Sequence, residues 1–355
     1  MHVLHVLGTR RDFLKAAPVV AALRRRRVRQ TLVHTGQPQH GAVPEDLLQA
    51  FDLPEPRFNL AVGSGTHTWQ TAEIMSRLEP VALRIEPDLV LVYGDVNSTV
   101  AAALAASKLG LRVGHVDAGL RSFDRTLPEE VNRVVTDQIS DLLFTSSAEA
   151  GGNLARESVP AERVHQIGNV TIDTLVRLLP QALAKRDAAG TIGLNGHRYA
   201  LVTLHRPYNV DDEGRLAGML DVLGEFSRHM IVVFSVTPRT AQRIRTVGPV
   251  PPDLRLVEPM GYVDFLSLEA RATVAITDSG SIQDETTFLA VPCVTVWPAT
   301  ERHETVTMGS NTVVADATGV RAELERVLAG EGKTGSVPPL WDGCAAERLA
   351  AVVCR

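Results

Sequence analysis

The stretch Leu89-Val90-Leu91-Val92-Tyr93-Gly94-Asp95 decides the fold class of this chain. Its apolar residues follow one another without a break, as in a strand that a parallel sheet buries on both faces. The run ends at a glycine followed by a carboxylate, and an alanine-rich helical pattern begins at about Ser98. A buried strand, a polar turn and a helix are the first parts of a βαβ unit, so this segment predicts an α/β protein with a parallel sheet.

The same alternation extends in both directions along the chain. Before residue 168 a helix is expected over 12–27, and further strands at His2–Leu7, Thr31–His34, Arg112–Val116, Leu143–Thr145 and Val164–Ile167. After residue 168 strands are expected at Tyr199–Leu204, Met230–Val236, Leu254–Val257, Thr273–Thr277 and Cys293–Val296. A chain of 355 residues exceeds the size at which one hydrophobic core stops growing. We therefore expect two domains, 1–168 and 169–340, and a C-terminal helix within 341–355 that packs back on the first domain.

Composition narrows the class of partner. A net charge of −5 argues against a nucleic-acid partner, which would require a basic surface. The three cysteines lack metal-ligand spacing, so no metal is expected. No apolar run approaches the roughly 18 residues that span a bilayer, and the N-terminus reads as a strand where a signal peptide would have a charged leader. We expect a cytoplasmic protein.

Polar residues follow the predicted strands, where open parallel sheets bind their ligands. They are Gly8-Thr9-Arg10, Asp95, Asp117, His205 and Asp278-Ser279-Gly280-Ser281. No Gly-x-Gly-x-x-Gly turn follows a strand and no P-loop is present, which disfavours a dinucleotide oxidoreductase and a P-loop kinase.

Each polar group has a functional and a structural interpretation. Ser279-Gly280-Ser281 opens a helix and suits a phosphate, although Asp278 or Ser279 could simply cap that helix. The carboxylates of Asp95, Asp117 and Glu129 suit acid–base chemistry. Alternatively they are turn and helix-start residues, since Pro128 precedes Glu129 as it does at many helix N-termini. His205 can bind phosphate or move protons.

Eight motifs, in order and spacing, resemble the non-hydrolysing UDP-N-acetylglucosamine 2-epimerases. They are Gly8-Thr9-Arg10 with Lys15 and Pro18; Gly94-Asp95 with Ser98-Thr99; His115 to Arg121; Pro128 to Arg133; Gly168-Asn169 with Asp173; Thr203 to Arg206; Asp278 to Glu285; and Thr300 to Arg302 with Glu304. The resemblance implies a GT-B fold, in which two Rossmann-like domains with parallel sheets face each other across a cleft. It also implies a homodimer that works on a UDP-sugar without NAD or metal.

The resemblance further implies a role for individual residues. UDP would be held mainly by the second domain, with Ser279, Gly280 and Ser281 on the phosphates and Glu285 on the ribose hydroxyls. Phe265 would lie against the uracil, and Arg10 and His205 would assist at the diphosphate. The catalytic groups would be Asp95, Asp117, Glu129 and His205, and those near the sugar or diphosphate would be Lys15, Arg133, Arg206 and Arg302. The family's reaction removes the C2 proton while UDP leaves C1, and returns both to the resulting 2-acetamidoglucal.

Departures from the family pattern leave other functions open. Asp117 and Asp12 stand where the family has glutamate, Ser281 replaces a glycine, and His303 replaces a proline. An epimerase for a modified UDP-sugar, a hydrolysing epimerase that releases ManNAc and UDP, a GT-B glycosyltransferase and a non-catalytic UDP-sugar sensor are the alternatives. A glycosyltransferase would not need three acidic strand-end residues, and a sensor would tolerate changes at Asp117.

A first prediction concerns activation by substrate. Bacterial members of the family bind a second, activating substrate molecule near a Thr-Gly-Gln-His loop, which reads Thr-Gly-Gln-Pro here and ends at Pro38, and near Gln70, which Trp69 precedes. Proline lacks an amide donor, and tryptophan fills space where a polar contact would be needed. We expect hyperbolic kinetics without a lag in the UDP-ManNAc to UDP-GlcNAc direction. A lag abolished by trace UDP-GlcNAc would show that the activating site is intact.

Overall fold

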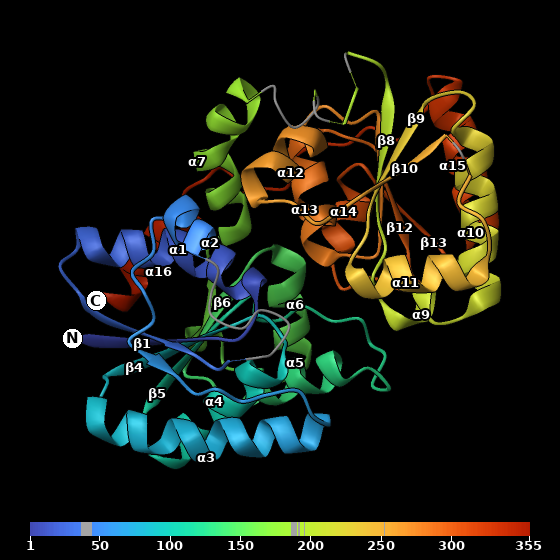
Figure 1. Ribbon diagram of the computed structural model, residues 1–355. Helices are drawn as coiled ribbons and strands as arrows, with labels where there is room; N and C mark the ends of the chain where they lie inside the picture. The colour runs from blue at the N-terminus through green and yellow to red at the C-terminus, as the bar shows by residue number, and fades with distance from the viewer. Residues whose placement is uncertain (37–44, 186–189, 191, 195, 252) are drawn as a thin grey trace. The chain divides into compact units, whose positions relative to one another are not determined.

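The computed structural model describes all residues except 37–44, 186–189, 191, 195 and 252 (Figure 1). The chain forms two compact units, Met1–Val176 with Pro339–Arg355, and Arg177–Pro338. The change from one unit to the other falls within helix α7 (Val170–Ala184). The limit at 168/169 expected from the sequence stays a prediction.

The first unit is built on a seven-stranded parallel sheet with the order β3-β2-β1-β4-β5-β6-β7. Its strands are β1 (His2–Leu7), β2 (Arg29–His34), β3 (Phe58–Asn59), β4 (Leu89–Tyr93), β5 (Arg112–Val116), β6 (Leu142–Thr145) and β7 (Val164–Gln166). The alternating strand and helix pattern predicted β1, β4 and β5 residue for residue. The two-residue edge strand β3 was missed because it has no periodic pattern of its own.

The helices of this unit connect the strands. They are α1 (Arg10–Arg25), α2 (Glu45–Phe51), α3 (His67–Ile85), α4 (Asn97–Lys108), α5 (Pro128–Ile139), α6 (Ala148–Arg156), the 3₁₀ helix η2 (Ala161–Arg163), the start of α7, and α16 (Ala345–Val353). Helix α1 begins two residues earlier than expected because Thr9 and Asp12 form a capping box. The Asp12 carboxylate also accepts the amide protons of Gly8 and Thr9, at 2.9 and 2.8 Å.

The C-terminal segment belongs to the first unit. The indole of the buried Trp341 donates to the carbonyl oxygen of Ser146 at 3.0 Å. Asp173, on α7, accepts the first amides of α16, those of Ala345 at 3.0 Å and Ala346 at 2.7 Å. Helix α16 packs against α1. Burial raises the pKa of Asp173 to about 6, against the pull of these two amide hydrogen bonds.

The second unit repeats the plan with a six-stranded sheet in the order β10-β9-β8-β11-β12-β13. Its strands are β8 (Tyr199–Thr203), β9 (Ile231–Ser235), β10 (Leu254–Val257), β11 (Val274–Thr277), β12 (Cys293–Val296) and β13 (Asn311–Val314). Its helices are α9 (Pro207–Val210), α10 (Glu213–Phe226), α11 (Pro238–Val247), α12 (Tyr262–Glu269), α13 (Gly280–Leu289), α14 (His303–Thr307) and α15 (Ala317–Leu328). The half-exposed edge strand β13 was not predicted.

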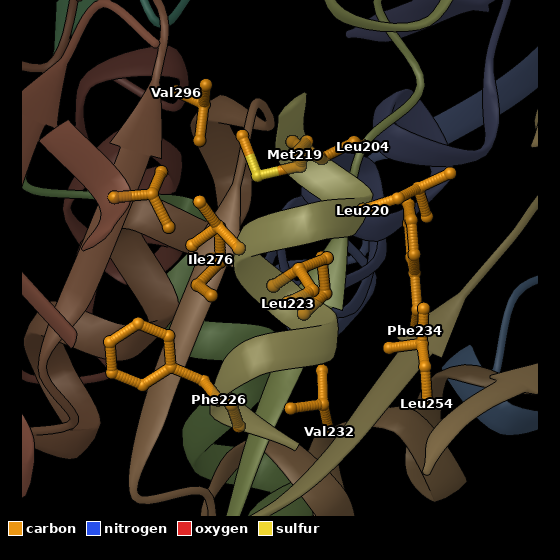
Figure 2. Packing of buried hydrophobic residues seen from close by; sticks show 14 of the residues in the cluster. Leu204, Met219, Leu220, Leu223, Phe226, Val232, Phe234, Leu254, Ile276 and Val296 are labelled. Atoms are coloured by element: carbon orange, nitrogen blue, oxygen red, sulfur yellow. The ribbon is translucent and has the colours of Figure 1, made fainter. Parts of the chain in front are cut away.

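The core of the second unit lies on both faces of its sheet. On one face Leu223 and Phe226 of α10 form a cluster with strand residues such as Val232, which Figure 2 labels, and α11 and α15 complete this cluster. On the other face α12 and α13 bring Leu268 and Ile282 against strands β8 and β11. Helices on both faces explain why the strands read as unbroken apolar runs.

In both sheets the strand order reverses once, between β1 and β4 in the first and between β8 and β11 in the second. This is the doubly wound arrangement, and ligands of such sheets bind at the reversal, beyond the carboxyl ends of the strands. The expected parallel α/β class is therefore confirmed. None of the helices within the described residues is long and apolar enough to cross a membrane.

A second prediction tests the return of the C-terminal segment. Gly168 has φ +91°, and a Cβ there would lie 2.1 Å from the carbonyl oxygen of Leu340. Gly110 has φ +70° but open space around it. Gly110→Ala should lower the free energy of unfolding by about 1 kcal/mol through backbone strain alone. Gly168→Ala should lower the free energy of unfolding by about 1–3 kcal/mol more than Gly110→Ala does, because the backbone at Leu340 must move. Urea unfolding of the two variants compares them, and equal losses would mean that the Leu340 contact is not tight.

Candidate functional site

Lys15, Gly94 and Asp117 meet at the strand-order reversal of the first unit. The Lys15 ammonium lies 2.6 Å from the Asp117 carboxylate, and both side chains are buried. Gly94 follows β4 with φ +65°, and a Cβ there would come within 2.9 Å of the Lys15 nitrogen. Glycine is required at this position because any side chain would displace the lysine.

Asp117 itself adopts a backbone conformation that is uncommon for a side-chain-bearing residue, with φ +70°. Aspartate and asparagine tolerate this left-handed region better than most residues. Backbone strain of this kind concentrates at functional sites. The Asp117 carboxylate, one methylene shorter than the glutamate of the family pattern, therefore lies on an unusual turn directly after β5.

Helix α5 holds Asp95 from the side. The buried guanidinium of Arg133 contacts the Asp95 carboxylate and also binds Glu130, at 2.7 Å. The side-chain amide of Asn132 donates to the carbonyl oxygen of Asp95 at 2.9 Å. Asp95 is about a third exposed, at 31%, so its carboxylate is anchored and still reachable by a ligand.

Glu129 and Glu130 have different environments. Glu130 is buried and accepts the amide protons of Ser122 and Phe123, at 2.9 and 3.0 Å. Burial works against its ionisation, but these amides and Arg133 together hold the pKa of Glu130 below its usual value. Glu130 thus fixes the loop before α5, and Glu129 lies half-buried beside it in the first helical turn. Of the two glutamates at this helix start, Glu130 therefore has a structural role.

Asp278 organises the strand-order reversal of the second unit. This buried carboxylate accepts the main-chain amide protons of His205 at 3.0 Å and Arg206 at 2.9 Å, and the Asn209 side-chain amide at 3.0 Å. The His205 ring contacts it through Nδ1 at 2.8 Å. Burial would raise the pKa of Asp278, but His205 and the hydrogen bonds hold it below its usual value. The loops after β8 and β11 are joined through this one side chain.

The start of α13 has the properties of an anion site. The helix begins at Gly280 after the N-cap residue Ser279, whose side chain makes no capping hydrogen bond. Asp278 is turned toward the β8 loop, so the capping alternative fails for both residues. The hydroxyl oxygens of Ser279 and Ser281 lie 3.2 Å apart over the first turn. Amide groups and small side chains at a helix N-terminus are suited to a phosphate.

Arg206 is held at the same edge. Its Nε donates to the carbonyl oxygen of Asp278 at 2.7 Å, and its guanidinium stacks over the Trp297 ring at 4.5 Å from the centroid. Tyr208 packs edge-on against Trp297, with 5.0 Å between ring centroids. Sequence reasoning missed Trp297 because it lies one residue beyond β12 and belongs to no motif. Arg302 is buried and pairs with Asp284 at 2.9 Å, and Arg10 is half-buried as the first residue of α1.

Helix α12 presents one face to Glu285. The Tyr262 hydroxyl donates to the Glu285 carboxylate at 2.8 Å. Glu269 is fully buried, and its pKa is raised well above the usual value by burial and by the neighbouring Glu285. Phe265 packs against the adjoining core. Tyr262 and Glu269 were missed, although their spacing of three and four residues from Phe265 places all three on one helix face.

Two remaining positions bear on the expected activating site. Trp69 is exposed on α3, and the neighbouring Gln70 accepts a hydrogen bond from Asn97 at 2.8 Å. Pro38 lies outside the described residues. Within the part of the chain that the structure describes, no group of three or more His, Cys, Asp or Glu could hold a metal ion.

Comparison with known proteins decides the family. The family model for UDP-N-acetylglucosamine 2-epimerase matches residues 21–354. This chain belongs to that family. The UDP-N-acetylglucosamine 2-epimerase of Methanocaldococcus jannaschii is 35% identical, over 98% of this chain and 97% of that protein. The UDP-2,3-diacetamido-2,3-dideoxy-D-glucuronate 2-epimerase of Pseudomonas aeruginosa is 34% identical over 100% of both chains.

A solved structure extends the family match to the fold. The M. jannaschii UDP-GlcNAc 2-epimerase in complex with UDP-GlcNAc and UDP superposes with a TM-score of 0.91, over 100% of this chain and 99% of that one. The resemblance to the UDP-N-acetylglucosamine 2-epimerase family and the GT-B fold class are thereby confirmed. The roles of the individual site residues stay predictions.

A third prediction concerns Asp278. Asp278→Asn keeps the shape but turns an amide group toward buried N–H donors, which should cost about 1–3 kcal/mol of unfolding free energy at pH 7. Because the folded-state pKa is lowered, the carboxylate stabilises the fold above its unfolded pKa of about 3.9 and loses this effect as the pH falls through the folded value.

The gap between wild type and Asp278→Asn should therefore close below about pH 4. Urea unfolding between pH 7 and pH 3 measures it, with the exposed Asp221→Asn on α10 as the control. A gap that stays constant with pH would show that the carboxylate charge is unimportant.

Proposed function

We propose that this protein is a non-hydrolysing UDP-N-acetylglucosamine 2-epimerase, which interconverts UDP-GlcNAc and UDP-ManNAc by elimination and re-addition of UDP. The observation that carries the proposal is the pair of ion-paired carboxylates at one sheet edge, Asp95 with Arg133 and Asp117 with Lys15. Two anchored carboxylates where a doubly wound sheet binds its ligand suit proton transfer to and from a sugar. The family relatives supply the substrate class.

The second unit would hold the nucleotide. The N-terminal amides of α13, at Ser279, Gly280 and Ser281, would bind the diphosphate, whose charge leaves with UDP in the reaction. His205, fixed by Asp278, would assist at the diphosphate, and Arg10 would add positive charge. Glu285, oriented by Tyr262, would accept the ribose hydroxyls, and Phe265 would lie against the uracil.

The first unit would carry out the proton transfers. A base takes the C2 proton, the C2–H electrons form the C1=C2 double bond, and the C1–O bond breaks as UDP departs. The 2-acetamidoglucal then receives a proton on the opposite face of C2 while UDP re-adds at C1. Asp95, Asp117 and Glu129 are the acids and bases, and the lysine beside Asp117 favours its carboxylate form. Lys15 compensates the charge of Asp117, and Arg133 that of Asp95. Arg206 and Arg302 would lie near the sugar or the diphosphate.

A second candidate substrate is a modified UDP-sugar. Asp117 is one methylene shorter than the glutamate of the family pattern, and a displacement of about 1 Å can cost on the order of 100-fold in rate. A sugar with different substituents would sit differently against the shorter group. The P. aeruginosa relative, which matches over the full length of both chains, is named for a modified UDP-sugar, UDP-2,3-diacetamido-2,3-dideoxy-D-glucuronate. We further propose a homodimer in the cytoplasm, as the resemblance implies.

Proton NMR of the protein with UDP-GlcNAc in D₂O tests the proposal. We expect deuterium at C2, the appearance of UDP-ManNAc and no build-up of UDP. Free UDP with ManNAc would establish the hydrolysing reaction. The same experiment is repeated with UDP-2,3-diacetamido-2,3-dideoxy-D-glucuronate. Turnover of this sugar without turnover of UDP-GlcNAc would establish a modified UDP-sugar as the substrate.

A fourth prediction separates chemistry from binding. Asp95→Asn and Glu129→Gln preserve shape, so affinity for UDP should stay within severalfold. Each should lower kcat by about 100-fold or more, the scale for loss of a general acid or base. Glu79→Gln, exposed on α3, is the control. Normal turnover in both site variants would show that Asp95 is only a turn residue and Glu129 only a helix-start residue.

A further inference from the structure

His115 lies on β5 with no exposed surface and makes two short contacts through its ring. Its Nε2 lies 2.7 Å from the carbonyl oxygen of Gly94, and its Nδ1 lies 2.6 Å from Oδ1 of Asp137 on α5. The histidine therefore bridges the end of β4 and the middle of α5. It touches the peptide group that joins Gly94 to Asp95.

The partners of His115 determine where its protons are. A carbonyl oxygen only accepts hydrogen bonds, so Nε2 must carry a proton. The Asp137 carboxylate is also bound by the Gly119 amide at 3.0 Å and by the Arg121 guanidinium at 2.7 Å, both through Oδ2. The guanidinium charge of Arg121 and the Gly119 amide favour the ionised carboxylate independently of His115. Asp137 is thus an acceptor, and Nδ1 must carry a proton as well.

We propose that His115 is an imidazolium that donates from both ring nitrogens and so fixes the Gly94–Asp95 peptide, and that it is a positioning residue for the epimerase reaction. The positioning part rests on the function proposed above, in which Asp95 is an acid or base. The charged state rests on the hydrogen-bond partners alone.

The surrounding charges stabilise a buried imidazolium at this position. Arg121 binds Glu157 through Nε at 2.7 Å and through its second nitrogen at 2.6 Å. His115, Asp137, Arg121 and Glu157 form a row of alternating charges, from β5 through α5 to the end of α6, whose sum is zero. A buried charge is tolerated when it is paired and hydrogen-bonded on every side.

The bond to Gly94 restrains the candidate catalytic carboxylate. The Gly94 amide donates to the Val116 carbonyl at 3.0 Å, and His115 holds the carbonyl of the same residue. Both hydrogen-bonding groups of Gly94 are therefore tied to β5, which ends directly before Asp117. Loss of the imidazolium would release the peptide that carries Asp95 and change its distance from Asp117.

His5, in the same unit, provides a matched comparison. It is equally buried, with Nδ1 2.7 Å from the Tyr93 hydroxyl and Nε2 3.0 Å from the side-chain oxygen of Gln30. A hydroxyl can donate, so a single proton on Nε2 satisfies both contacts. Burial lowers the pKa of His5 to about 4, although the Gln30 hydrogen bond opposes this. His5 is therefore neutral at pH 7.

Nitrogen-15 NMR of histidine-labelled protein at pH 8 tests the charged state, with His115→Gln and His5→Gln used for assignment. An ordinary histidine, with a pKa of about 6.5, is almost entirely neutral at this pH. We expect imidazolium shifts at both nitrogens of His115 and the split shifts of a neutral ring for His5. Asp137→Asn should convert His115 to the neutral form. Neutral shifts for His115 in the wild-type protein would overturn the proposal, whatever the activity.

Kinetics tests the positioning role. His115→Gln should lower kcat for the UDP-sugar by about 10- to 100-fold, the range for a displaced catalytic group, with KM and UDP affinity changed less than about threefold. His5→Gln should leave kcat unchanged. An unchanged kcat in folded His115→Gln, or an equal loss in His5→Gln, would overturn the positioning role; if His115→Gln does not fold, Asp137→Asn takes its place with the same expected loss.

Failure of the proposed function gives a different result. Wild-type protein that turns over no UDP-sugar while His115 shows imidazolium shifts would overturn the epimerase function and the positioning role together. The buried charge would then stand as a property of the fold.

Discussion

The reversal of strand order in each parallel sheet is the constraint on which the rest of the structure depends. At β1 and β4, and again at β8 and β11, neighbouring strands send their connections to opposite faces. The loops beyond these strand ends separate and leave main-chain groups that need partners. Asp278 in the second unit and Asp12 in the first accept main-chain amide protons of these loops. The same geometry that creates a ligand crevice therefore requires buried ionic groups to hold its walls.

Compensation of buried charge is the common device of both sites. Arg133 lies between Asp95 and Glu130, Lys15 faces Asp117, and Arg302 faces Asp284. Pairs of this kind contribute little net stability, since desolvation offsets attraction, but a pair with a missing partner is strongly destabilising. They hold each charge in one place. An enzyme that stabilises a departing diphosphate and moves protons on two faces of a sugar benefits from charges that do not reorganise during the reaction.

Among the departures from the family pattern, Asp117 is the one that falls on a carboxylate proposed for the chemistry. Asp117 keeps the charge of the expected glutamate and changes its reach, while its lysine partner remains at 2.6 Å. Trp297 and Tyr208 form an aromatic support for Arg206 at the edge of the second sheet. The groups suited to the nucleotide, Ser279 to Ser281 and Glu285, sit on a regular helix start.

The sequence by itself determined the parallel α/β class, the family, and the position of most inner strands. The buried strand Leu89–Tyr93 is an unbroken apolar run because both faces are covered, and this pattern is local. The edge strands Phe58–Asn59 and Asn311–Val314 escaped prediction, because a strand with one neighbour and partial exposure has no such pattern. Motif spacing also found the strand-end residues Asp95, Asp117, His205 and Ser279. Only the tertiary structure decided what each polar group does: Asp278 joins two loops, Glu130 holds a loop and leaves Glu129 beside it, and His115 meets an acceptor at each nitrogen. Those assignments depend on partners 7 to 73 residues away in the chain. The contacts of His115 and Asp278, which join residues 21 to 73 apart, exist only once the sheet has brought the strand ends together.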